Sequence, residues 1–266
     1  MPPQANNVRS MQVFHQKNQK ISRWYALYVV PLLLLIWQLA AMISDSNLIL
    51  PTPVSVLRAF FALAKTDFFW SAALFSLARV LLGFFIGGAV GILFALLAHV
   101  FRYSEPFFRA IIIITKSTPV VSFIIIAWFY LETEALPTFI AALMVIPIFY
   151  TNTKTGLSSI DPHLSEVTWL YDLKPLQKLR LLWLPSLLPH LTSATLTGCG
   201  LAWKAGIAAE VIVQVNRSLG REMFFSKSYL EIENLFAYTI TVILLSLGIE
   251  YLLRFLFKKE GSDAKN

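Results

Sequence analysis

Cysteine and charged residues are scarce in this sequence. A single cysteine, Cys199, stands among 266 residues, which excludes an internal disulfide and argues against a thiolate metal site. Charged residues make up 14% of the chain, against roughly 25% in an average soluble domain. Hydrophobic residues make up 57%, and a water-soluble protein of this size cannot bury that much apolar surface. The sequence therefore predicts an integral membrane protein.

The patterns of nucleotide-binding and catalytic sites are also missing. No Gly-x-x-x-x-Gly-Lys-Ser/Thr loop is present to hold phosphates. There is no nucleophile elbow, no His-Glu-x-x-His and no carboxylate cluster, and the four histidines lack the spacing of metal ligands. We therefore expect no enzyme activity, cofactor or metal in this chain. Any ATP hydrolysis that it depends on would take place on another polypeptide.

Six apolar runs have about the length that a membrane helix needs, which is roughly 20 residues. The runs are continuous, without the alternation that is typical of a membrane barrel. The first is longer than the apolar part of a signal peptide and lacks a clear small-residue cleavage site, so we expect it to be retained. The sequence predicts an all-α membrane protein with spans at 24–43, 79–100, 107–130, 136–152, 190–215 and 233–257.

Lysine and arginine are distributed unequally between the two sides of these spans. We count Arg79, Arg109 and Arg254, near the ends of spans, with the adjoining segments. With a cytoplasmic N-terminus, fourteen of the 22 bases then lie in inside segments, six lie in outside segments, and two fall within spans. This bias favours both termini in the cytoplasm. The predicted organisation is a tail at 1–23, a transmembrane domain at 24–257 with its largest cytoplasmic loop at 153–189, and a second tail at 258–266. Residues 44–78 would lie outside, partly as an apolar helix along the membrane.

The largest cytoplasmic loop combines charges with prolines in an ordered way. Glu166 suits the N-terminus of a short helix, and Asp172 tolerates the left-handed conformation that ends one. Pro175 fits the first turn of a second short helix, which Pro185 and Pro189 would stop. The residues predict two short helices at an angle, forming a rigid surface for a cytoplasmic partner. The alternative is a solvated connector that only joins two spans.

The same loop resembles the cytoplasmic loop of permease subunits of binding-protein-dependent ABC importers. That family carries Glu-Ala-Ala, three residues, Gly, and then Leu-Pro after about a dozen residues. Here Glu166-Val167-Thr168, Asp172 and Leu184-Pro185 occupy these places with the spacing preserved. The resemblance implies that the loop docks in a groove of the ATP-hydrolysing subunit. The coupling residues that it implies are Glu166, Val167, Thr168, Asp172, Pro175, Leu184 and Pro185.

Three further stretches resemble the nitrate, sulfonate and taurine branch of that family. They are Leu50–Pro53, Ser76–Phe84, and Leu201–Trp203 together with Ala209-Glu210. The resemblance implies a type I importer permease in a bacterial plasma membrane, acting as a homodimer with two ATPase subunits. The solute would be a small anion or zwitterion such as nitrate, a sulfonate or taurine, or a small organic precursor. A solute-binding protein would dock outside, against parts of 44–78, 131–137 and 216–232.

Lys116, Lys204 and Glu210 are ionisable residues inside predicted spans. A charge at mid-bilayer costs between ~3 and ~15 kcal/mol, so each should face protein or water. Lys116 precedes Pro119, which removes a helix hydrogen bond, and a broken helix beside a cation is typical of translocation paths. We expect Lys116 or Lys204 to attract an anionic solute. The alternative for each is pairing with a carboxylate or reaching the interface.

Glu210 lies six residues after Lys204 and so points to a different helix face. It needs a partner on another helix or subunit, or a water-lined gate, and we predict gating or helix bridging. Trp203 either lines the path or packs in the protein. A rival prediction is an ion-coupled secondary transporter or channel, in which Lys116, Lys204 and Glu210 form a charge relay.

Glycines recur at four-residue intervals in the second predicted span. This spacing places them on one helix face, where they allow two helix backbones to approach closely. The expected role is packing, either within the subunit or at the seam of a dimer. The residues are Gly83, Gly87 and Gly91.

Overall fold

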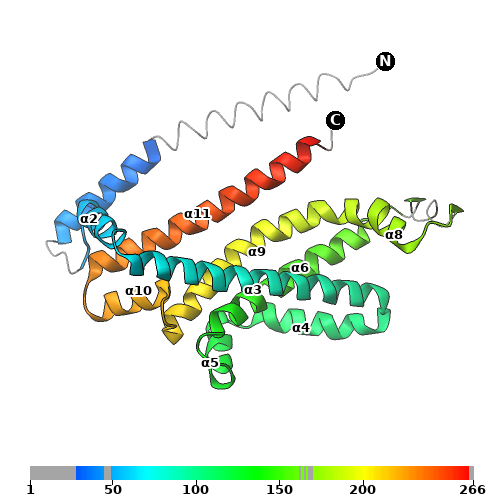
Figure 1. The fold of residues 1–266 in the computed structure, drawn as a ribbon, viewed down its shortest axis with the longest axis horizontal. Coiled ribbons are helices and arrows are strands. Elements are labelled where there is room, and N and C mark those ends of the chain that lie inside the picture. The colour runs from blue at the N-terminus through cyan, green and yellow to red at the C-terminus, as the bar shows by residue number, and fades with distance from the viewer. Residues whose placement is uncertain (1–27, 45–48, 162, 165, 167–169, 264–266) are drawn as a thin grey trace, which may run out of the picture.

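The computed structural model describes residues 28–44, 49–161, 163–164, 166 and 170–263, and within them every regular element is helical (Figure 1). The predicted tail at 1–23 lies outside the described residues. The helices are Tyr28–Ser44, α2 Pro53–Leu63, α3 Asp67–Val100, α4 Glu105–Ser117, α5 Val120–Tyr130, α6 Leu136–Ser158, α8 Pro175–Lys178, α9 Leu184–Val213, α10 Leu219–Ser228 and α11 Ile232–Asp263.

The core forms where α3, α6 and α9 pack along one another. A Cβ atom added at Gly83, Gly87 or Gly91 would lie 2.3–2.6 Å from a backbone carbonyl oxygen of α6. The absence of side chains thus lets α3 and α6 touch backbone to backbone. Of the two places expected for these glycines, the contacts of this chain put them within the subunit. Phe84 and Phe149 close the gap beside them, with ring centroids 5.6 Å apart.

Four helical stretches among the described residues are long and apolar enough to cross a membrane: α3, α6, Leu176–Val213 and Ile232–Phe257. Helices α4 and α5 together pass the same test but are bent by 107°. They occupy the span predicted at 107–130 and form a broken span or a re-entrant loop. The described part of the first predicted span is the apolar helix Tyr28–Ser44.

The helix that contains the second predicted span, 79–100, begins before the predicted membrane edge. Helix α3 begins at Asp67, after Thr66, whose hydroxyl accepts a hydrogen bond from the Phe69 N–H at 3.4 Å. A threonine cap followed by an acid in the first turn is a strong helix start. The apolar helix predicted outside the spans is present only as α2, which Thr52 caps in the same way.

The prediction that Pro185 and Pro189 stop a helix is wrong. From α8 the helix continues through a π-helical stretch, Leu179–Trp183, directly into α9, with both prolines inside it. Local π geometry and hydroxyl side chains compensate for the N–H groups that proline lacks. The Ser186 hydroxyl, next to Pro185, donates to the Leu182 carbonyl at 2.8 Å. The loop is therefore shorter than predicted.

The helices alternate in direction between two ends of the molecule (Figure 1). One end holds α8, the connection between α3 and α4, and the C-terminal end of α11. Toward the other end lie α2, α5 and α10. Helix α11 continues through 258–263, so these residues of the predicted C-terminal tail extend the last span as helix.

Candidate functional site

Glu210 is fully buried near the C-terminal end of α9. Its Oε2 accepts hydrogen bonds from the Ser76 hydroxyl of α3 at 2.7 Å and from the Gly220 N–H of α10 at 3.3 Å. Its Oε1 lies 3.8 Å from Nη1 of Arg79 and accepts no hydrogen bond from the described residues. The carboxylate thus joins α3, α9 and α10.

The chain needs two special backbone positions to bring α10 back onto Glu210. Gln214 ends α9 in the left-handed conformation, with φ of 52°, and Arg217 follows with φ of 47°. At Gly220 a Cβ atom would lie 2.4 Å from the Cβ of Glu210. A larger residue there would push α10 away and remove one of the two hydrogen bonds to the buried carboxylate.

Arg79 is the cation of this network and is mostly buried, with 15% of its side chain exposed. Its Nη2 lies 2.5 Å from the Glu134 carboxylate in the turn before α6. The guanidinium also donates to two backbone carbonyls in the turn between α9 and α10, those of Asn216 at 3.0 Å and Arg217 at 3.3 Å. Arg79 therefore ties α3 to both turns at this end of the molecule.

Sequence reasoning predicted a partner for Glu210 but did not identify Ser76, Arg79, Glu134 or Gly220. Arg79 was counted among the bases outside the spans and lies in the stretch Ser76–Phe84 that resembles the family, but it was not assigned to Glu210. The available signal was the position of Glu210 along the membrane normal. A buried acid near one end of a span needs a cation at the same height on a neighbouring helix. We call Ser76, Arg79, Glu134, Glu210 and Gly220 the Glu210 network.

The break between α4 and α5 lies where the sequence placed it. Helix α4 ends at Ser117, and α5 begins directly after Pro119. The Thr115 and Thr118 hydroxyls donate to the carbonyls of Ile111 and Ile114 at 2.9 and 2.8 Å. Lys116 is exposed and has no ion pair among the described residues.

Trp203 and Lys204 point to different sides of α9. Trp203 is buried, and its indole N–H donates to the Val242 carbonyl of α11 at 3.1 Å. Within one chain it therefore packs between two helices. Lys204 is exposed, and neither it nor Lys116 has a hydrogen bond or ion pair to the Glu210 network in the described structure. A relay connecting the three charges is not assembled in this chain.

The segment that resembles the coupling loop projects beyond α6 and α9 (Figure 1). Val167 and Thr168 lie outside the described residues. Glu166 is helical and exposed, 3.8 Å from Nδ1 of His163. Asp172 has a φ of 45°, the left-handed conformation that the sequence predicts there. Pro175 opens α8, and Leu184 and Pro185 open α9.

Comparison with known proteins places this arrangement in a family. The family described as "Binding-protein-dependent transport system inner membrane component" matches residues 87–260, well over half of the chain. The putative aliphatic sulfonates transport permease protein SsuC of Escherichia coli (strain K12) is 29% identical over 199 residues, covering 74% of this chain and 75% of the relative. The nitrate import permease protein NrtB of Synechocystis sp. is 26% identical over 195 residues, covering 69% and 70%.

The fold is also found in solved transporters. A chain of an amino acid ABC transporter crystallised with histidines superposes with a TM-score of 0.62 at 16% identity, covering 75% of this chain and 98% of the other. A likeness at this identity concerns the fold alone. The family implies an ATPase and a solute-binding protein as partners. The family match shows that the chain belongs to the binding-protein-dependent inner membrane components, and that it is a multi-pass permease subunit of an ABC importer and not an enzyme.

Proposed function

We propose that two copies of this permease enclose a path for a small anion or zwitterion, and that ATP binds only to the separate ATPase subunits. The observation that carries the proposal is the exposure of Lys204 in the membrane-spanning helix α9. It has no ion pair among the described residues. A lysine facing lipid costs at least ~3 kcal/mol. Its face of α9 should therefore meet water or a second copy.

The residues around Lys204 form a polar stripe along α9. Ser193 and Thr197 are exposed, as Lys204 is. Gly200, between Thr197 and Lys204, has open space beside it. Positions 193, 197, 200 and 204 fall on one helix face, and eleven residues of helix cover about 17 Å. The opposite face is buried against α3 and α6. The stripe thus suits the wall of a path that runs through much of the bilayer.

A homodimer with its two-fold axis along this path would place two copies of Lys204 across from each other. Two lysines facing one path favour an anionic solute. Two relatives are named for such solutes, aliphatic sulfonates and nitrate. Lys116 and Pro119, at the break between α4 and α5, would add a second cation near a bent helix. The Glu210 network would hold the helices on the other side of the stripe as the path opens.

The projecting segment is the proposed docking site of the ATPase. Leu170, Tyr171 and Leu176 each expose about three quarters of their surface there, and gathered apolar side chains of this kind mark interaction sites. The continuous helix from α8 through α9 would carry a displacement of the docked segment to Lys204. This end and both termini would then be cytoplasmic, while α2, α10 and the turn before α6 would face the binding protein.

The test is uptake by the complete importer in proteoliposomes, with labelled nitrate and labelled taurine as probes. Lys204→Gln should lower uptake at least tenfold while the ATPase still co-purifies. Lys204→Arg is the matched control, because it keeps a cation at the same place on α9 and should retain most of the uptake. Undiminished uptake by Lys204→Gln would contradict the proposed path. Uptake driven by an ion gradient without the ATPase would instead support the secondary transporter, which the family match does not favour.

A further inference from the structure

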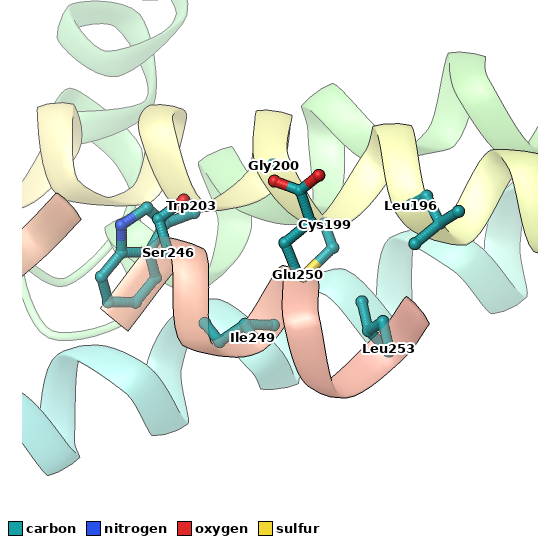
Figure 2. A pocket seen from close by; sticks show the side chains of 8 residues that line it. All are labelled: Leu196, Cys199, Gly200, Trp203, Ser246, Ile249, Glu250 and Leu253. Carbon is teal, nitrogen blue, oxygen red and sulfur yellow. The ribbon is translucent and has the colours of Figure 1, made fainter. Parts of the chain in front are cut away.

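A small cavity lies between α9 and α11 (Figure 2). Its volume is about 30 Å³, little more than a water molecule needs, so it is no solute site. Cys199, Gly200 and Trp203 line it from α9, and Ser246 and Glu250 line it from α11. Figure 2 shows the Glu250 side chain reaching from α11 to α9 beside Gly200. A carboxylate inside a membrane span is costly and calls for a cation.

The ion pair that Glu250 makes among the described residues is with a cation of its own helix. Arg254 lies one turn further along the same helix, with Nη2 and Nε at 2.7 and 3.0 Å from Oε1 of Glu250. The Glu250 side chain is 48% exposed and that of Arg254 is 64% exposed. Arg254 lies near the end of the apolar stretch Ile232–Phe257, so its long side chain can reach the membrane interface without Glu250. Glu250 can therefore exchange Arg254 for another cation at small cost.

Lys204, which has no ion pair among the described residues, lies next to this cavity along α9. Among the residues that line the cavity, Trp203 is the residue before Lys204 on α9, and Gly200 lies one turn earlier. Side chains of a helix lean toward its N-terminus, so that of Lys204 leans over Gly200. No heavy atom lies within 4 Å of a Cβ built at Gly200. The missing side chain leaves room for the lysine to reach the Glu250 carboxylate.

We propose that Glu250 is the exchangeable counterion of Lys204. It holds the ammonium group while the path is empty and returns to Arg254 when an anion takes its place. Glu250 is thus a positioning residue, and it makes the positive charge on the path conditional on the presence of solute. The inference rests on the proposed role of Lys204 in the path.

A double-mutant cycle on the purified permease–ATPase complex tests the pair. The thermal midpoint is measured for the natural sequence, Lys204→Gln, Glu250→Gln and the double variant. We expect the thermal midpoint of the double variant to fall by no more than that of the more destabilised single variant. Arg254→Gln in the background should strengthen this coupling, because Glu250 then has only Lys204. Glu233→Gln, an acid in the first turn of the same helix, is the control and should be additive with Lys204→Gln.

The exchange itself is tested by repeating the cycle in excess nitrate, methanesulfonate or taurine. At least one of these probes should reduce the coupling severalfold. If the effects of Lys204→Gln and Glu250→Gln on the thermal midpoint are additive, the two residues do not pair. If none of the three probes changes the coupling, an anion does not replace Glu250 as the partner of Lys204. If the effects are additive but Lys204→Gln still abolishes uptake, only this inference fails. If the coupling is present and uptake by Lys204→Gln is normal, the pair stands and the proposed path fails.

Discussion

Removing the Arg79 guanidinium should destabilise the permease by about 3–5 kcal/mol, the usual cost of leaving a buried charge without its partner. The perturbation is Arg79→Gln. Glu210 would keep the hydrogen bonds from Ser76 and Gly220 but lose the only cation within 4 Å in the described structure. At the observed 3.8 Å and an effective dielectric constant of about 20, that attraction amounts to roughly 4 kcal/mol.

The other contacts of Arg79 contribute less to the expected loss. Glu134 is half exposed, so its ion pair is worth about 0–1 kcal/mol. The hydrogen bonds to the Asn216 and Arg217 carbonyls are partly accessible to water, which can replace them. The buried carboxylate therefore accounts for most of the effect. It follows that Arg79→Gln combined with Glu210→Gln should be at least about 2 kcal/mol more stable than Arg79→Gln alone, because no buried charge then remains.

The assay is reversible unfolding of the permease in mixed micelles, followed by tryptophan fluorescence. Arg58→Gln serves as the control, since Arg58 is an exposed arginine of α2, and should change the unfolding free energy by less than about 0.5 kcal/mol. A loss below about 1 kcal/mol for Arg79→Gln would refute the reasoning. So would a double variant as unstable as the sum of the two single changes.

Three more predictions concern the core, the docking segment and pH. Gly87→Ala should cost about 1–3 kcal/mol of unfolding free energy, because its Cβ would lie 2.4 Å from a carbonyl oxygen of α6, whereas Gly248→Ala, with open space around it, should not destabilise. Leu176→Asp should weaken ATPase binding at least tenfold in a pull-down, and Leu230→Asp, at another exposed leucine toward the other end, should leave it intact. Burial raises the pKa of Glu222 above its usual 4.5, against a smaller lowering by Arg221; ionisation then opposes folding. Glu222→Gln should therefore stabilise the permease slightly at pH 7 in a thermal melt, by under about 1 kcal/mol, with the gain vanishing below pH 4.5.

Local features were predictable because neighbouring residues decide them. The helix break at Pro119 comes from the proline itself, and the left-handed backbone at Asp172 depends on its own short side chain. Pro185 shows the limit of this reasoning. In an isolated peptide a proline followed by another four residues later favours a helix end, but here a π-helical turn absorbs it and α9 continues.

By itself, the sequence determined the membrane class, the helical architecture, the importer family and the charges that need partners. The family follows from the resemblance of the loop that contains Glu166 and Pro185. The other features follow from composition, run length and spacing, which do not depend on how the helices are arranged. The tertiary structure alone decided which cation meets Glu210, since Arg79 and Glu210 are 131 positions apart and only packing of α3 on α9 brings them together. It also decided which face of α9 is left open. Spans that are apolar on all sides carry no periodic signal of their neighbours, so only the packed helices separate the buried Trp203 from the exposed Lys204.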